Sequence, residues 1–369
     1  TRLVINENNS LIKKEEQRGL ASILGGENSV VEISDGATLE VKRGVVNIRG
    51  TIAGAGDLHF IDTINNFIDP PDGSESTHTG EVLIDEAEIA LRTGALANST
   101  AVTFKNNRFT DEEGNLRDIS IADPDAFRNG VNLTMQNDAF LRLSGDNKAP
   151  ISHSADQLVI DPNSEIELTS KAKLRAQNAT IEGDISGTGD LIFNGGQTST
   201  IKTSGTSFSG TTQVIGGSTL TLEVTDALGG VDVLTLAGGS TVEARDSNVF
   251  NNNTRLWLQT GENRLDIQGP QSAGSLTLSE SSTVAFTSSS SDGNDKLILS
   301  SADQKSVIDG QFEEVSAGGE VRINNHTAEV NAQQPNMTFT VGNNAHLKTP
   351  YGGAFSDMRS TSLRTARYR

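Results

Sequence analysis

The sequence predicts an all-β fold, a right-handed single-stranded parallel β-helix of about 16–18 coils with loop or hairpin insertions. Three observations lead to this prediction. An eleven-residue pattern recurs at multiples of about 20 residues, a thirteen-residue segment occurs twice, and aromatic residues make up only 4% of the chain. We expect the β-helix to occupy residues 1–350.

The eleven-residue pattern consists of two apolar-x-apolar triplets separated by small or turn-forming residues. Each triplet alternates with a period of two, which is typical of a short strand with one face turned inward. The separating residues are rich in Gly, Asn, Asp and Ser, which favour turns. A step of about 20 residues corresponds to one coil of a β-helix. The pattern occurs at Val31–Val41, Leu133–Leu143, Leu158–Leu168, Leu234–Ala244, Leu276–Phe286 and, more loosely, Phe339–Thr349.

The thirteen-residue segment appears at Ile48–Phe60 and again at Ile181–Phe193. Both copies read Ile-x-Gly-x-Ile-x-Gly-x-Gly-Asp-Leu-x-Phe. Such a long match predicts that the two segments form equivalent coils of the same repeating architecture.

The composition limits both the core and the chemistry. The chain has 369 residues, 37 Gly and no Cys, and its formal net charge is −19. So few large aromatic side chains favour a thin core over a globular one. Without cysteine there is no disulfide scaffold, thiolate nucleophile or Cys-ligated zinc. The acidic surface disfavours nucleic acid and anionic membranes as partners.

Two stretches interrupt the repeat and are predicted to project from the coils as loops or hairpins. The first lies near residues 59–80 and contains Pro70 and Pro71, and the second lies near 104–130. Because solenoids commonly carry specific contacts on insertions, we expect binding residues there. The candidates are Asp72, His78, Asp111, Glu112, Glu113 and Asn115.

No catalytic, cofactor-binding or metal-binding residues are expected, and no cofactor is predicted. The five histidines are scattered without metal-ligand spacing and are interpreted as solvated loop side chains. No Ser-His-Asp constellation of the protease type occurs either. Residues 351–369 form a basic tail or linker with four arginines and one acid.

The segment Gly183–Leu222 resembles the autotransporter-associated β-strand repeat of passenger domains exported by type V secretion. That repeat opens with Gly-x-Gly-x-Leu and a Gly-Thr stretch. It continues into a Ser/Asn-Thr-[Tyr/Phe]-[Ser/Thr]-Gly-x-Thr-x-Val run and ends in Gly-x-Leu. The matching residues are Gly187, Gly189, Leu191, Thr206, Phe208, Ser209, Gly210, Thr212, Val214, Gly217 and Leu220.

The resemblance implies a non-enzymatic adhesin of the AIDA or antigen-43 kind. Such a passenger would mediate autoaggregation, biofilm formation or host attachment, and hence virulence. Its partners would be like passengers, host glycans or extracellular matrix proteins, and not nucleic acid. It would lie at the bacterial cell surface, attached to the outer membrane or released, with no transmembrane segment of its own and a membrane barrel following it.

Two alternatives remain open at this point. The first is a polysaccharide lyase or hydrolase built on the same fold, which would use clustered carboxylates. The second is a purely structural stalk that belongs to a larger passenger.

Overall fold

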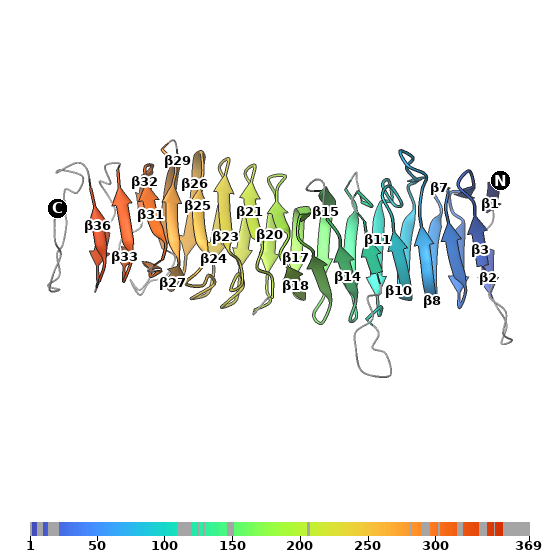
Figure 1. The fold of residues 1–369 in the computed structure, drawn as a ribbon, viewed down its shortest axis with the longest axis horizontal. Helices are drawn as coiled ribbons and strands as arrows, with labels where there is room; N and C mark the ends of the chain where they lie inside the picture. The colour runs from blue at the N-terminus through green and yellow to red at the C-terminus, as the bar shows by residue number, and fades with distance from the viewer. Residues whose placement is uncertain are drawn as a thin grey trace. The chain divides into compact units, whose positions relative to one another are not determined.

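The computed structural model describes residues 2–5, 10–13, 22–108, 120–123, 125–127, 130–145, 151–204, 207–280, 282–288, 296–301, 303–315, 320–331, 338–342 and 344–349. Within these residues the regular secondary structure is β-strand throughout (Figure 1). The chain divides into two compact units. Unit 1 comprises Thr1–Ala176 with Ile181–Asp190, and unit 2 comprises Gln177–Thr180 with Leu191–Arg369.

The strands of unit 1 form three ladders, one for each side of a coil. The first ladder is β1 (Arg2–Ile5), β4 (Val30–Ile33), β7 (Thr51–Gly54) and β9 (Thr77–His78). The second is β2 (Ser10–Lys13), β5 (Thr38–Lys42), β8 (Asp57–Ile68), β10 (Glu81–Leu91), β11 (Ala101–Lys105), β13 (Asn132–Gln136) and β15 (Ile151–Ile160). The third is β3 (Ser22–Gly25), β6 (Val45–Ile48), the second halves of β8 and β10, β12 (Ser120–Ala122), β14 (Phe140–Leu143), β16 (Glu165–Leu168) and β18 (Asp184–Gly187).

Unit 2 repeats this arrangement with three ladders of its own. One contains β20 (Thr198–Ile201), β22 (Thr219–Leu222), β24 (Thr241–Ala244), β26 (Gly261–Ile267), β29 (Ser282–Ser288) and β32 (Gln311–Val315). Another contains β21 (Thr211–Ile215), β23 (Val233–Ala237), β25 (Arg255–Leu258), β28 (Ser275–Leu278), β31 (Lys305–Ile308), β34 (Thr327–Val330) and β36 (His346–Lys348). The third contains β27 (Pro270–Ala273), β30 (Lys296–Leu299), β33 (Glu320–Ile323) and β35 (Thr338–Val341). The strands β17 (Ala172–Ile181) and β19 (Asp190–Phe193) contribute residues to both units.

The pairings in these ladders are parallel, and the predicted parallel β-helix is therefore confirmed. The described strands make about 12 turns, fewer than the predicted 16–18. The prediction divided the chain by a step of about 20 residues, but several coils are longer. Val102 pairs with Leu133 and Thr277 pairs with Val307, so each of these two coils exceeds that step by about half.

The eleven-residue pattern corresponds to two strands on neighbouring sides of one coil. Val31–Val41 spans β4 and β5, and Leu234–Ala244 spans β23 and β24. The turn-forming residues between the triplets form the corner, where Gly36 in the first copy and Gly238 and Gly239 in the second have positive φ angles of 73°, 69° and 74°. Glycine adopts this backbone region without the steric cost of a Cβ.

The core of each unit consists of apolar side chains stacked from one coil to the next. Alternate residues of each strand point inward, so equivalent positions of paired strands lie one above another. In unit 1 one such buried stack is Leu39, Leu58, Val82, Val102, Leu133 and Leu158. In unit 2 a corresponding stack is Val214, Leu236, Leu258, Leu278, Ile308 and Val330.

Buried polar side chains satisfy the backbone where the ladders are interrupted at corners. In unit 1 the Asn66 amide oxygen accepts a hydrogen bond from the Val46 backbone N–H at 2.8 Å. In unit 2 the Ser306 hydroxyl accepts one from the Leu276 N–H at 2.9 Å. Each acceptor belongs to the coil that follows its donor in the ladder, and it replaces a carbonyl that the corner cannot supply.

The first predicted insertion, near 59–80, is wrong at its start, whereas its residues 69–76, with Pro70 and Pro71, lie between β8 and β9. Its first ten residues belong to β8, which pairs with β5, β6 and β10. Asp62 and Asn65 have positive φ angles of 52° and 55°, so their polar sequence marks a corner of the coil and not a projecting loop. The second predicted insertion, near 104–130, contains β12 and the buried residue Phe127. Its residues 109–119, like the predicted tail 351–369, lie outside the described residues.

The repeated thirteen-residue segment reflects a close approach between coils. Gly54 and Gly187 occupy equivalent positions and have φ angles of 98° and 93°. A Cβ at Gly54 would lie 1.9 Å from the Ile33 carbonyl oxygen, and one at Gly187 would lie 2.1 Å from that of Leu168. Both glycines are therefore required by steric contact with the preceding coil, as well as by their backbone angle.

We predict that Gly54→Ala and Gly187→Ala each lower the free energy of unfolding by about 3 kcal/mol, because the new Cβ meets backbone atoms that cannot rotate away. Gly36→Ala is the matched control, since Gly36 also has a positive φ of 73° but has nothing within 4 Å of a Cβ. It should cost only about 1 kcal/mol. Urea denaturation followed by circular dichroism measures the difference. Equal losses in all three variants would contradict the close-approach explanation.

Candidate binding groove

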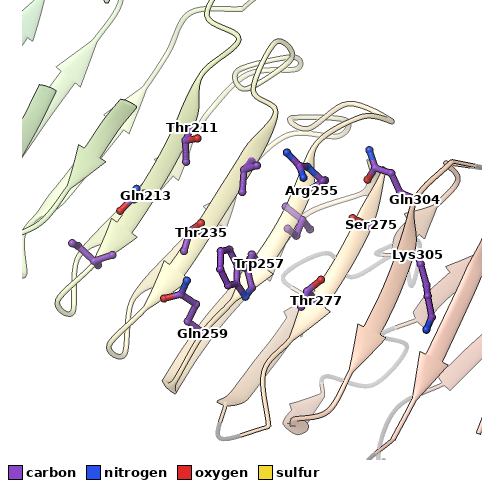
Figure 2. A pocket seen from close by; sticks show the side chains of 13 residues that line it. Thr211, Gln213, Thr235, Arg255, Trp257, Gln259, Ser275, Thr277, Gln304 and Lys305 are labelled. Atoms are coloured by element: carbon purple, nitrogen blue, oxygen red, sulfur yellow. The ribbon is translucent and has the colours of Figure 1, made fainter. Parts of the chain in front are cut away.

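A groove of about 670 Å³ lies on the outward side of one ladder of unit 2 (Figure 2). Residues of β21, β23, β25 and β28 line it, together with Lys305 at the start of β31. Two further lining residues lie next to strands: Gln259 directly follows β25, and Gln304 directly precedes β31. Its volume falls in the range of sites that hold small ligands. The lining residues are Thr211, Gln213, Ile215, Val233, Thr235, Arg255, Leu256, Trp257, Gln259, Ser275, Thr277, Gln304 and Lys305.

The strand register places the central lining residues in one outward row. Gln213 pairs with Thr235, Thr235 with Trp257, and Trp257 with Thr277. Within β25 the residues on either side of Trp257 are Leu256 and Leu258, each 1% exposed. Because strand side chains alternate between faces, these two inward leucines fix Trp257 on the outside.

Trp257 is the largest exposed apolar side chain of the row and is 44% exposed. Its paired neighbours in the ladder are threonines, which leave space above the sheet for an indole ring. In Figure 2 the ring extends from β25 toward the strand that carries Thr235. Thr235 is only 7% exposed although it lies on the outward face. The indole thus forms an apolar plate among hydroxyl and amide groups.

The described residues that line the groove include no carboxylate, although the chain has 48 acidic residues. Its two cations already have anionic partners outside the lining. Arg255 Nη2 lies 2.5 Å from Asp232 Oδ2, and Lys305 Nζ pairs with the Glu329 carboxylate. The local charge is therefore close to neutral, and the groove offers mainly hydrogen-bond donors and acceptors.

Of the six binding residues predicted from the sequence, the structure describes two, Asp72 and His78. The other four predicted binding residues lie outside the described residues: Asp111, Glu112, Glu113 and Asn115. Asp72 is exposed in the turn between β8 and β9. His78 is fully buried, with its ring nitrogens 3.0 Å from the Ser99 hydroxyl and 2.7 Å from the Gly56 carbonyl. The His78 ring cannot reach a ligand, because both its nitrogens bond neighbouring coils.

The interpretation of the histidines as solvated loop residues is wrong for three of them. His78 and His153 are 0% exposed, and His326 is 2% exposed. His326 is held by Ser306 Oγ at 2.7 Å and the Ser301 carbonyl at 2.6 Å. Burial lowers the pKa of all three side chains below the usual 6.5, because the charged imidazolium loses its hydration. These histidines therefore belong to the core and corners of the coils.

No three His, Asp or Glu side chains gather closely enough to hold a metal ion in the part of the chain that the structure describes. That part also contains no helix long and apolar enough to cross a membrane. The chain matches no protein-family model, and no curated protein or solved structure matches it. The geometry of the groove is thus the main guide to function.

Sequence reasoning missed this groove because it looked for chemistry on insertions. Trp257 is the only tryptophan of the chain, and it stands in the alternating segment Arg255–Leu258. Its position between two leucines predicts an outward side chain, which is an unusual place for a large apolar residue. Only the register, however, shows which residues lie beside it.

The buried histidines predict a loss of stability on acidification. The unfolded chain binds protons on its histidines below their usual pKa of about 6.5, whereas the folded chain resists protonation because burial lowers the pKa. Above pH 6.5 these histidines therefore leave the free energy of unfolding unchanged. As the pH falls below 6.5, the free energy of unfolding decreases, because the unfolded chain binds protons that the folded chain does not.

His153→Phe tests this prediction, because the variant removes one titrating group that lies in edge contact with Phe127, with ring centroids 6.2 Å apart. We expect the midpoint of thermal unfolding to fall less between pH 7.5 and pH 5.5, roughly one unit on either side of that pKa, in the variant than in the unchanged chain. Superposable pH profiles would show that His153 protonation is not linked to folding.

Proposed function

We propose that this chain is a non-enzymatic adhesion module that acts at a bacterial surface, where it binds like chains, host glycans or matrix proteins. The observation that carries the proposal is the carboxylate-free groove around Trp257, which spreads polar groups over neighbouring strands. Such a surface suits binding by many moderate contacts. The β-helix fold and the resemblance of Gly183–Leu222 to the autotransporter-associated repeat support export and surface display.

Binding is favoured over hydrolysis by what lines the groove. Glycoside hydrolysis requires a pair of carboxylic acids across the scissile bond, and lyases likewise need an acid–base group. Among the described residues that line the groove there is no Asp, Glu or His, and Arg255 and Lys305 are paired with acids. Adhesion requires only affinity, which repeated contacts raise through avidity.

The proposal predicts that the chain, displayed on a non-aggregating bacterium, causes clumping or attachment to surfaces coated with glycans or matrix proteins. Purified chain added in solution should compete and reduce the effect, because it occupies the same contacts. Settling and attachment assays measure both. The control displays the chain with Gly54→Ala and Gly187→Ala combined, which should disrupt folding of the coils in unit 1. Cells that neither clump nor attach, despite folded chain on their surface, would contradict the proposal.

A further inference from the structure

We infer that the groove around Trp257 binds an extended, uncharged polysaccharide chain that runs across the strands of unit 2. This inference rests on the proposed adhesive function and deepens it by assigning a ligand class to one site. Four properties of the described residues carry it: the exposed indole, the hydrogen-bonding groups around it, the spacing of the strands and the charge balance.

The exposed indole needs a partner with an apolar face. Trp257 is 44% exposed, and covering a large aromatic side chain is a major source of binding free energy. One face of a pyranose ring presents C–H groups, while hydroxyls project from its edge. A sugar lying on the indole would cover the apolar ring and direct its hydroxyls to the polar groups beside it.

Those polar groups include both donors and acceptors, as sugar hydroxyls require. Amides come from Gln213, Gln259 and Gln304. Hydroxyls come from Thr211, Thr235, Ser275 and Thr277. Figure 2 shows amide and hydroxyl groups on both sides of the Trp257 ring. Most of these residues sit on strands held by the core, so they are pre-organised and lose little freedom on binding.

The spacing of the strands matches a chain of sugars. The lining residues lie on or next to five successive strands of one ladder: β21, β23, β25, β28 and β31. Neighbouring parallel strands are about 4.8 Å apart, so the outermost strands are roughly 19 Å apart. The distance between neighbouring strands is close to the length of one sugar unit in an extended polysaccharide. A ligand of about four sugars would therefore meet an equivalent set of groups at each step.

The charge balance favours an uncharged ligand. Arg255 and Lys305 are already paired with Asp232 and Glu329, and the lining residues that the structure describes include no carboxylate. An anionic ligand would have to compete with these acids for the two cations. The net charge of −19 opposes nucleic acid and acidic polymers over longer distances. It also opposes a second copy of the chain as the occupant.

The test uses the full chain and exploits its single tryptophan. Any change in tryptophan emission on binding must arise at Trp257. Neutral oligosaccharides of increasing length, made from glucose, mannose or galactose, are titrated in, and hyaluronan serves as the acidic comparison. We expect at least one neutral series to shift the emission, with affinity rising up to about four sugars and little dependence on salt.

Variants connect the signal to the groove, with affinities measured by calorimetry. Trp257→Ala should weaken binding at least tenfold, roughly the lower limit for a central aromatic contact, and Trp257→Phe should weaken it less. Thr277→Glu keeps the tryptophan and should abolish the shift by filling the space beside it. Arg264→Ala is the control, at an exposed position of β26 outside the lining, and should bind normally.

Several results would overturn the inference. They are binding of no neutral polysaccharide, unchanged affinity in Trp257→Ala, and binding of hyaluronan alone with strong salt dependence. Self-association that Trp257→Ala abolishes would also overturn it, because the occupant would then be a second copy. The inference and the proposed function can fail separately. A chain that clumps cells but binds no glycan refutes only the inference, and one that binds glycan without causing attachment refutes only the function.

Discussion

The structure depends on hydrogen bonding between successive coils. Each strand uses its backbone groups to pair in parallel with the coil before and the coil after it, and corners need other partners. Asn66 and Ser306 supply side-chain acceptors to backbone N–H groups of the preceding coil. Gly54 and Gly187 allow two backbones to approach where any Cβ would collide. The composition rich in Gly, Asn, Ser and Thr follows from this requirement, since every coil has several corners.

This constraint explains which parts of the sequence could be interpreted correctly. The paired triplets, such as Val31–Val41, predict strands because inward and outward residues alternate on each side of a coil. Corners were harder to recognise. The interrupted repeat near 59–80 predicts a projecting loop, but Asp62 and Asn65 at its start turn the chain within β8. The sequence also fails to reveal the buried histidines, since a His that bonds a neighbouring coil has no distinctive sequence pattern.

The groove could not be derived from the sequence, because it depends on register. The central residues of the groove lie about 20 positions apart in the sequence and become neighbours only when the coils stack. They are Gln213, Thr235, Trp257 and Thr277. The same stacking that satisfies the backbone thus creates rows of outward side chains at a constant spacing. A ligand with a matching repeat can use such a row without any further specialised element. This geometry connects the folding constraint to adhesion in physical terms.

Hydroxyl-radical footprinting of the chain, free and bound to an oligosaccharide, tests most directly whether the outward row of unit 2 is the binding surface. The internal control is Ile64 of unit 1, which is 56% exposed and lies outside the groove. We predict that oxidation of Trp257 falls sharply in the bound state while oxidation of Ile64 is unchanged. Equal oxidation of Trp257 in the free and bound states would contradict the account.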